Sequence, residues 1–414
     1  MNECREVRLG DVAKFIDYRG KTPRKTESGI PLITAKIVKN GSILPPNEFI
    51  APEDYDAWMT RGLPKIGDVV LTTEAPLGEV AQLKDAHVAL AQRIIVLRAK
   101  EDVLDNTFLK YFLLSAEGQS RLKARETGTT VTGIKSSELQ EVLVPIPALL
   151  EQKKIARILS SLDDKIEVNN QINRNLEEQA KAIFKSWFID FEPFQDGIFV
   201  DSELGRIPKG WIVGKFTDVV QILGGGTPKT SIPEYWNGTI PFFTPKDVGD
   251  SIYTFATEKH LAEDGLNNCN SRLYPENTVF VTARGTVGKL ALAGVPMAMN
   301  QSCYALIGKD NMPSLYVFCL ALQVVETLKK IANGAVFDAI VTRDFETNNV
   351  IIPPEEVINR FVETITPLFK IIHSNGIQNT SLVQSRDILL PKLMSGEIAL
   401  PEECISNLVE HSPN

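Results

Sequence analysis

The chain has 414 residues, of which 43% are hydrophobic and 23% are charged, and its formal net charge is −8. This length predicts two or three domains, and the composition is typical of a folded globular protein. No apolar run reaches the roughly 18 residues that a membrane helix needs, and the N-terminus lacks the apolar stretch of a signal peptide. We therefore expect a cytoplasmic protein with no membrane partner.

The charges are unevenly distributed along the chain. Residues 1–150 carry 20 basic and 20 acidic side chains, whereas 355–414 carry four basic and eight acidic ones. Within the first part, 18–40 holds six basic residues against the single acid Glu27. A negative total therefore does not exclude nucleic-acid binding, because the acidic residues gather away from the basic segment.

Two halves of the chain carry matching segments in the same order. The pairs are Arg19-Gly20-Lys21-Thr22-Pro23 with Gly225-Gly226-Thr227-Pro228-Lys229, 29–36 with 238–246, 67–73 with 276–282, Ala91-Gln92-Arg93 with Asn300-Gln301-Ser302, and 142–147 with 350–354. Their offset stays between 205 and 210 residues, which predicts a duplication. The segments are short β-branched runs bounded by Gly, Pro and Asn, so each half is expected to begin with a β-rich domain.

A helical pattern follows each closing proline segment, over 149–188 and 356–394. In each run, apolar or Asn residues recur at spacings that alternate between four and three. This spacing is typical of the contact face between two paired helices, called the seam here. The seam positions are Ile155, Leu159, Leu162, Ile166, Asn169, Asn173 and Leu176 in the first run, and Phe361, Ile365, Leu368, Ile372, Asn375, Asn379 and Leu382 in the second. The alternative is that each helix packs only on its own domain.

The matched seams predict that the two helices pair. The second domain begins where the first helix ends, so the second helix must run back along it. The expected fold is α+β: two β-rich globular domains joined by two long antiparallel helices in a coiled coil, as a pseudo-twofold tandem repeat. Pro367 and Pro391 fall inside the second run, where proline removes a hydrogen bond, so we expect that helix to start late or bend.

No motif for catalysis, metal binding or cofactor binding is recognisable. The segment 285–289 lacks the spacing of a phosphate-binding loop, and Gly224-Gly225-Gly226 opens onto Thr227-Pro228 rather than onto a helix. The four histidines and five cysteines show no zinc-ligand spacing, and the cysteines are read as small buried apolar residues. We therefore expect no catalytic residue, no metal and no cofactor.

Four stretches resemble the specificity (S) subunit of type I restriction–modification enzymes. They are 145–156, with Pro145-Ile146-Pro147 and Glu151-Gln152; 182–193, with Trp187-Phe188-Ile189-Asp190-Phe191-Glu192-Pro193; 204–211; and 225–238, with Tyr235-Trp236-Asn237-Gly238. The resemblance covers nearly the whole chain. It departs at Arg19-Gly20-Lys21, which replaces a double glycine, and at Ile358-Asn359, which replaces the Glu-Gln pair.

The resemblance implies that each β-rich domain is a target-recognition domain reading half of a bipartite site in double-stranded DNA. It implies that the helices dock two methyltransferase (M) subunits, which methylate adenine, and that restriction (R) subunits join them. The chain itself would be no enzyme. The expected domains are 1–148 (target-recognition domain 1), 149–190 (central helix), 191–354 (linker and target-recognition domain 2), 355–397 (distal helix) and 398–414 (tail).

Polar and basic residues near predicted turns are the candidate DNA contacts, since such side chains bind phosphates and base edges. They are Arg19, Lys21, Arg24, Lys25, Lys36, Thr73 and Arg93 in the first half, and Thr227, Lys229, Lys246, Arg284, Thr286, Asn300 and Gln301 in the second. Lys21 lies in the basic run, and Arg284 is a lone arginine among small residues, so these two are the leading candidates.

Three other interpretations remain open at this point. The chain could be the DNA-recognition subunit of another multisubunit restriction–modification type, with different partners. It could be a coiled-coil scaffold whose β-rich domains bind protein or carbohydrate. It could also be an enzyme whose site has no recognisable motif.

Overall fold

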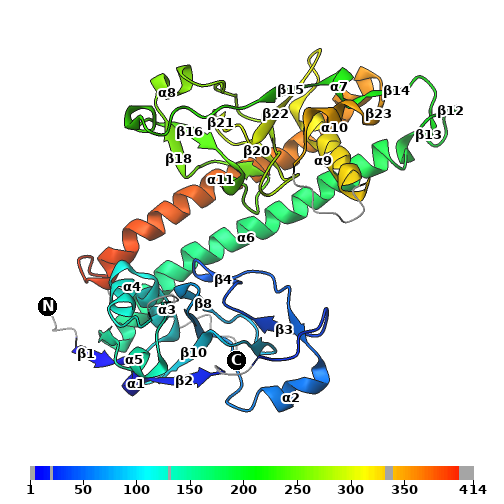
Figure 1. Ribbon diagram of the computed structural model, residues 1–414. Coiled ribbons are helices and arrows are strands. Elements are labelled where there is room, and N and C mark those ends of the chain that lie inside the picture. Colours follow the sequence, from blue (N-terminus) through cyan, green and yellow to red (C-terminus); the bar gives the residue numbers. More distant parts are fainter. Residues whose placement is uncertain (1–4, 19–21, 129–131, 332–338, 401–414) are drawn as a thin grey trace. The chain divides into compact units, whose positions relative to one another are not determined.

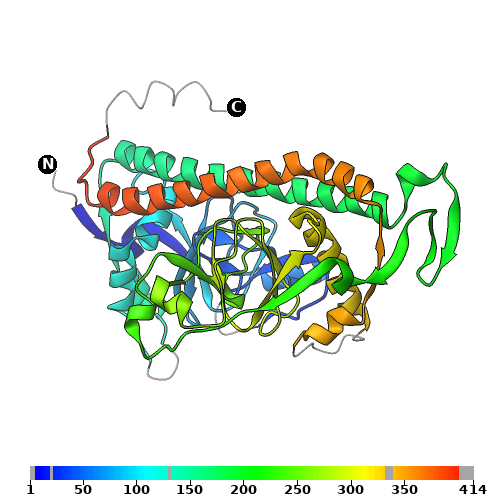
Figure 2. The same ribbon diagram turned by 90° about the horizontal axis from the view of Figure 1, so that it is seen from above.

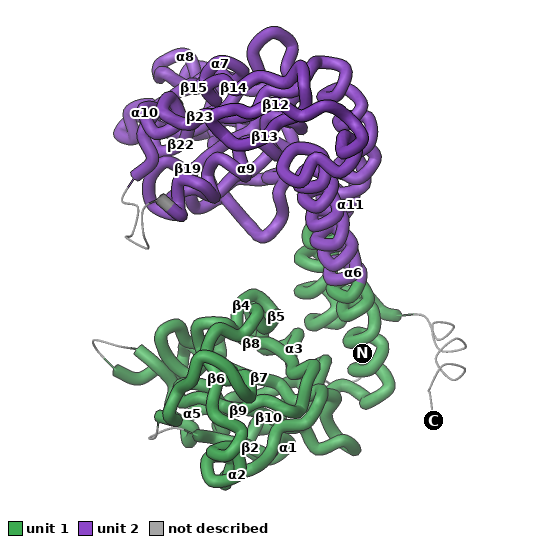
Figure 3. The backbone as a smooth tube through the Cα atoms, turned by 90° about the vertical axis from the view of Figure 1, so that its right-hand side faces the viewer, with its two compact units in different colours: residues 1–164, 382–414 green, residues 165–381 purple. Residues whose placement is uncertain are grey.

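The structure is a computed structural model that describes residues 5–18, 22–128, 132–331 and 339–400. It divides into two compact units, which Figure 3 colours separately. Unit 1 comprises residues 1–164 and 382–414, and unit 2 comprises 165–381. Each of the two long helices, α6 (Leu149–Phe188) and α11 (Glu355–Met394), is shared between the units.

Unit 1 is built on a four-stranded antiparallel sheet of order β2-β10-β7-β8. Its elements before α6 are β1 (Arg5–Arg8), α1 (Leu9–Val12), β2 (Ala13–Asp17), β3 (Ile30–Ile33), β4 (Val38–Lys39), β5 (Ser42–Ile43), β6 (Phe49–Ile50), η1 (Pro52–Asp54), α2 (Tyr55–Trp58), β7 (Val69–Thr73), β8 (Leu77–Gln82), β9 (Ala89–Leu90), β10 (Ile94–Ala99), α3 (Asn106–Leu114), α4 (Ala116–Lys123), α5 (Ser136–Gln140) and β11 (Leu143–Ile146). All five residues of β7 are buried, so both faces of this strand are covered.

Two hydrophobic clusters cover the two faces of that sheet. One joins Val69, Leu71, Ile95 and Leu97 to α3 and to the beginning of α6. The other joins alternate residues of the same strands, including Val70 and Val96, to the small sheet β6-β3-β9. The sheet therefore forms the middle layer of unit 1.

Unit 2 is built on a sheet of order β15-β22-β19-β20-β17. Its elements between α6 and α11 are η2 (Glu192–Phe194), β12 (Phe199–Ser202), β13 (Gly205–Pro208), β14 (Ile212–Lys215), α7 (Phe216–Val219), β15 (Val220–Gly224), η3 (Pro233–Tyr235), β16 (Ile240–Phe243), η4 (Pro245–Asp247), β17 (Tyr253–Thr254), β18 (Lys259–Leu261), α8 (Glu263–Asn267), β19 (Val279–Thr282), β20 (Leu290–Ala293), β21 (Ala298–Met299), β22 (Cys303–Gly308), α9 (Ser314–Ile331), α10 (Thr342–Glu346) and β23 (Asn349–Ile352). Figure 1 labels most of these elements.

The two units connect their main strands in the same way. The order β2-β10-β7-β8 of unit 1 matches β15-β22-β19-β20 of unit 2, and the pair β1-β11 matches β14-β23. Backbone hydrogen bonds also match: Thr73 N donates to Arg93 O at 2.9 Å, and Ala283 N donates to Ser302 O at 2.8 Å. Unit 2 adds β17 and the β12–β13 hairpin.

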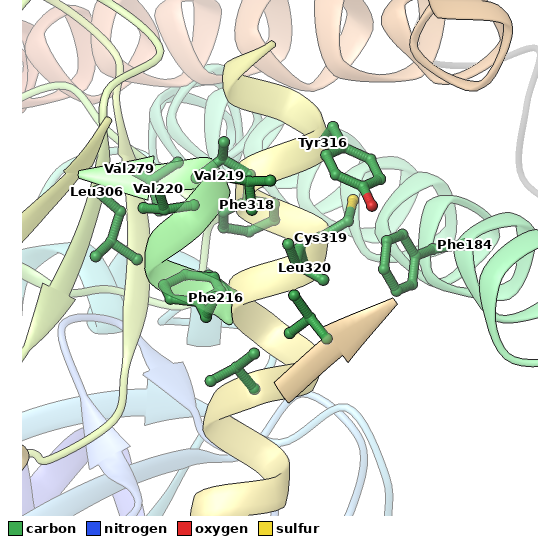
Figure 4. Packing of buried hydrophobic residues seen from close by; sticks show 14 of the residues in the cluster. Phe184, Phe216, Val219, Val220, Val279, Leu306, Tyr316, Phe318, Cys319 and Leu320 are labelled. Atoms are coloured by element: carbon green, nitrogen blue, oxygen red, sulfur yellow. The ribbon is translucent and has the colours of Figure 1, made fainter. Parts of the chain in front are cut away.

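The core of unit 2 joins the sheet, α9 and both long helices. Figure 4 shows Phe184 of α6 close to Tyr316 of α9, and their ring centroids are 6.2 Å apart. Phe361 of α11 is fully buried and contacts four aromatic rings, those of Phe184, Trp187, Phe188 and Tyr316. The end of α6 and the start of α11 are thus held together by the same aromatic cluster.

Both long helices contain 40 residues, which corresponds to about 60 Å each. The first has the predicted bounds, and the second begins at Glu355 and continues through Pro367 and Pro391. The expectation of a late start is therefore wrong. Thr366 Oγ1, beside Pro367, donates to Val362 O, so a side chain supplies one bond in the turn where proline has no N–H.

The predicted seam residues are all buried or half-buried. The two helices lie side by side in Figure 2, and within unit 2 they join through amides. Asn169 Nδ2 donates to Asn379 Oδ1 at 2.9 Å, and Asn375 Nδ2 donates to Asn173 Oδ1 at 2.8 Å. These bonds pair ascending with descending residue numbers, so the segments run antiparallel. Several seam side chains, such as Ile155 and Ile365, also pack into the core of their own unit.

Unit 1 holds its helix segments through a charged cluster. Asp163 of α6 accepts hydrogen bonds from Tyr111 Oη at 2.6 Å, Lys110 Nζ at 3.2 Å and Arg386 Nη1 of α11 at 2.9 Å. Burial alone would raise the pKa of Asp163, but Lys110, Tyr111 and Arg386 together hold it below its usual value. Burial lowers the pKa of Lys110 although Asp163 opposes this. Asp163 therefore links α3, α6 and α11.

Within the described ranges, no helix is long and apolar enough to cross a membrane.

Candidate nucleic-acid interface

Four loops of unit 2 meet at one end of its main sheet. They follow β15, β16, β19 and β21, and we call residues 225–229, 244–246, 283–289 and 300–302 the unit 2 loop surface. Strand register brings the loops together, since Gly224 lies opposite Tyr304 and Thr282 lies opposite Cys303. A Cβ on Gly225 would lie 2.1 Å from the Asn300 carbonyl oxygen, so only glycine permits this approach.

Side-chain bonds tie these loops to one another. Thr227 Oγ1 donates to Gln301 Oε1, and Thr286 Oγ1 donates to the Pro245 carbonyl oxygen at 3.2 Å. Asn300 is half-buried, and its Oδ1 accepts from Ser302 N at 3.0 Å, which fixes the turn. Four of the seven residues predicted in this half form these bonds through their side chains: Thr227, Thr286, Asn300 and Gln301. Lys246 directly follows Pro245, and Arg284 N donates to Ser302 O at 3.3 Å. Lys229 extends the first loop.

The basic side chains of the unit 2 loop surface are exposed and unpaired. Lys229, Lys246 and Arg284 form no ion pair with any residue in the described ranges. Lys289, which sequence reasoning missed, is also exposed and directly precedes β20. In the segment 285–289, which lacks the spacing of a phosphate-binding loop, the sequence pointed only to Thr286 as a DNA contact. In the structure it forms the β19–β20 turn, with Gly285 at φ +81° and Gly288 at φ +72°.

The corresponding loops of unit 1 also meet, and we call residues 22–25, 34–36, 74–76 and 91–93 the unit 1 loop surface. Ala91 N donates to Ile33 O at 2.9 Å, as Asn300 N donates to Phe243 O at 2.9 Å in unit 2. Arg24 is exposed and has no ion pair among the described residues. Arg19 and Lys21, which were also predicted as DNA contacts, lie outside the described residues.

The other basic residues of the unit 1 loop surface are paired with acids. Lys25 Nζ lies 2.8 Å and Lys36 Nζ lies 3.7 Å from Glu48 carboxylate oxygens. The hydrogen bond from Lys25 holds the pKa of the Glu48 carboxyl below its usual value. Arg93 Nε lies 3.0 Å from Glu74 Oε1, with both side chains about half exposed. The two loop surfaces therefore differ in chemistry.

Thr73 does not belong on this surface. It is 2% exposed, and its Oγ1 is buried with no hydrogen-bond partner among the described residues. Thr73 is buried like the other four residues of β7 because both faces of this strand are covered. This placement corrects the prediction that Thr73 contacts DNA.

A family model described as "Type I restriction modification DNA specificity domain" matches residues 1–178 and 208–380. The chain belongs to this family. Each matched segment of the specificity-domain family holds one main sheet and a large part of one long helix. The β12–β13 hairpin, except its last residue Pro208, falls between the two segments.

The chain is also similar in sequence to specificity subunits of type I restriction enzymes. The chain is 32% identical over 348 residues to the "Type I restriction enzyme MjaIX specificity subunit" of Methanocaldococcus jannaschii, covering 83% of this chain and 80% of that one. It is 26% identical over 468 residues to the HindI specificity subunit of Haemophilus influenzae, covering 96% of this chain and 100% of that one.

A solved specificity subunit shares the fold. The crystal structure of the type I restriction–modification S subunit from M. genitalium aligns with a TM-score of 0.55 at 17% sequence identity. The alignment covers 95% of this chain and 97% of that chain. At this identity the similarity concerns the fold alone. The α+β architecture with two specificity domains and long helices is therefore shared with the family.

Within the described ranges, no group of three or more His, Cys, Asp or Glu residues is placed to hold a metal ion. Buried Cys303 and Cys319 have thiol pKa values raised to about 12, in both cases mainly by burial. Thiolates are the reactive form of cysteine, so these two side chains act as packing residues.

Proposed function

We propose that the chain is the DNA-recognition subunit of a type I restriction–modification complex and has no catalytic site of its own. The observation that carries this proposal is the unit 2 loop surface, where exposed Lys229, Lys246 and Arg284 stand unpaired on converging loops. Unpaired cations attract phosphates, and polar groups between them contact base edges. Family membership of both halves supports the same role for the unit 1 loop surface.

We further propose that the site is bipartite and that its two halves differ in sequence. One recognition domain would span 1–148 and the other 191–354, with 149–190 and 355–397 as their helices. The antiparallel Asn bonds support a coiled-coil ruler with pseudo-twofold symmetry, because polar layers specify register. Two readers on a ruler contact DNA segments at a set separation.

The direct test is selection from a random library of DNA duplexes by the chain co-expressed with its methyltransferase subunit. We expect a bipartite motif with two different halves and an unread spacer. Selection of no sequence by the assembled complex would contradict the proposal.

Replacing Arg284 by alanine is expected to weaken cognate binding about tenfold, since a specific arginine contact contributes roughly 1–3 kcal/mol. If Arg284 also neutralises a phosphate, the slope of the logarithm of affinity against the logarithm of salt concentration should become shallower by about one. Fluorescence anisotropy at several salt concentrations measures both quantities.

Lys209→Ala is the matched control for the arginine variant. Lys209 is exposed in unit 2 but lies at the turn after β13, outside the loop surface. Equal losses in the two variants would remove Arg284 from the interface.

We propose that M subunits, two per complex, dock on the long helices and that R subunits join them. Val168 and Ile172 lie one turn apart on α6 and are 47% and 40% exposed. Adjacent exposed apolar side chains mark interaction sites more strongly than isolated ones. Their placement on a long helix of unit 2 supports docking there.

Changing both Val168 and Ile172 to serine is expected to reduce capture of the M subunit by about tenfold or more, since buried apolar anchors dominate interface energies. Co-purification at matched expression measures this effect. Leu63→Ser is the control, because Leu63 is 56% exposed in a loop of unit 1. Full capture by the double variant would place docking elsewhere.

A further inference from the structure

One position of the fold carries opposite charges in the two units. Glu74 directly follows β7, and Arg284 lies two residues after the end of β19. Each forms an isolated antiparallel bridge, Glu74 with Gly133 and Arg284 with Ala339. The next backbone bonds also correspond, since Ile134 N donates to Thr73 O and Ile340 N donates to Ala283 O, both at 2.9 Å.

The residue across the sheet from this position also differs between the two units. Arg93 and Ser302 both supply the carbonyl oxygen that accepts from the strand end, as described above. Arg93 has φ +73°, a left-handed conformation that residues with a side chain rarely adopt, whereas Ser302 has no positive φ. Such backbone outliers concentrate at functional sites.

The Glu74–Arg93 ion pair leaves both side chains with free bonding capacity. It engages Arg93 through Nε, and no hydrogen bond joins the two terminal nitrogens to a described residue. Those two nitrogens are the fork that binds guanine O6 and N7. A carboxylate accepts hydrogen bonds and repels phosphates, so Glu74 is suited to a base amino group and unsuited to the DNA backbone.

We propose that Glu74 and Arg93 form a paired base-reading element on the unit 1 loop surface. Arg93 donates two hydrogen bonds to guanine, and Glu74 accepts one from the amino group of a cytosine while holding the guanidinium in place. This inference rests on the proposed function and names determinants of one half-site. It also assigns different base preferences to Glu74 and Arg284 at equivalent positions.

The test is duplex selection by the assembled complex containing Glu74→Gln. A glutamine amide reads adenine, so one position of the first half-site should change from cytosine toward adenine. Discrimination against the wrong base at that position should fall about tenfold. Binding to non-cognate DNA should be equal or tighter, because one repulsive charge is removed.

Two further variants separate reading from folding. Arg93→Gly keeps the left-handed backbone accessible, so the fold should be retained while guanine preference is lost. Glu141→Gln is the matched control: Glu141 is 42% exposed and its Oε2 lies 3.3 Å from Arg8 Nε, whereas Glu74 is 40% exposed. It should leave the motif unchanged.

The outcomes distinguish the two proposals. An unchanged motif in Glu74→Gln, with affinity altered equally for all sequences, would overturn the base-reading role and leave the proposed function standing. A wild-type complex that selects no motif would overturn the proposed function itself.

Discussion

Replacing Phe361 by alanine is expected to lower the free energy of unfolding of unit 2 by about 3–5 kcal/mol, since that is the usual cost of removing a buried aromatic ring. Phe361 is fully buried, and its ring centroid lies 4.9 Å from that of Phe188 and 5.9 Å from that of Trp187. The loss should therefore separate the start of α11 from the end of α6. Denaturant titration followed by tryptophan fluorescence measures it.

Ile371→Ala is the control on the same helix. Ile371 is 46% exposed, so its truncation should cost less than about 0.5 kcal/mol. Comparable losses in the two variants would show that the aromatic cluster does not hold the helices together.

Replacing Asp163 by alanine is expected to destabilise unit 1 by about 3 kcal/mol, the lower end of the cost of breaking a buried ion pair, because Asp163 is 24% exposed. The variant leaves the ammonium of Lys110, which is 8% exposed, without its carboxylate partner. It also removes the bond from Arg386 that links α11 to α6. Thermal and denaturant unfolding measure the change.

The free energy of unfolding at low pH provides a second, independent test of the Asp163 interactions. The pKa of Asp163 is lower in the folded chain than its usual value, so its contribution is complete above the unfolded pKa and is lost as pH falls through the folded pKa. Wild-type stability should therefore fall below about pH 4 more steeply than that of Asp163→Asn. The neighbouring exposed Asp164, changed to alanine, should match the wild type. An identical loss of stability at low pH in wild type and Asp163→Asn would contradict this account.

The helices were predictable because their periodicity is local. The helical pattern predicted a helix over 149–188, and these are the bounds of α6. The late start expected for α11 was wrong. A helix can continue through a proline that faces solvent when the neighbouring side chains are packed and hold the turn. Pro367 is exposed, while Ile365 and Phe369 on either side are buried.

The loop surfaces were only partly predictable. Residue type and turn position found Lys246, Arg284 and Gln301, which the structure brings together. The same reasoning wrongly named Thr73 as a DNA contact. The sequence at the end of a strand does not show whether a side chain faces solvent or the core. It missed Glu74 as a partner of Arg93, because their pairing depends on the β7–β10 register rather than on local spacing.

The segment that joins α6 to β14 packs within unit 2 only in part. Phe191 and Phe194 contact the Trp211 ring, with centroids 5.5 and 5.0 Å away. The β12–β13 hairpin that follows leaves Val200 and Leu204 exposed. Composition cannot distinguish the packed segment from the exposed hairpin, because both contain apolar residues. The sequence does not show whether an apolar residue packs within the chain or is exposed.

Sequencing of methylated adenines in the host genome shows whether this chain selects the DNA target of the complex. We expect wild-type cells to carry a bipartite methylated motif with two different halves. Deletion of this chain should remove the motif while the methyltransferase is still made. Restoring the chain should restore the motif. Adenine methylation that is identical with and without the chain would contradict its role as the DNA-recognition subunit.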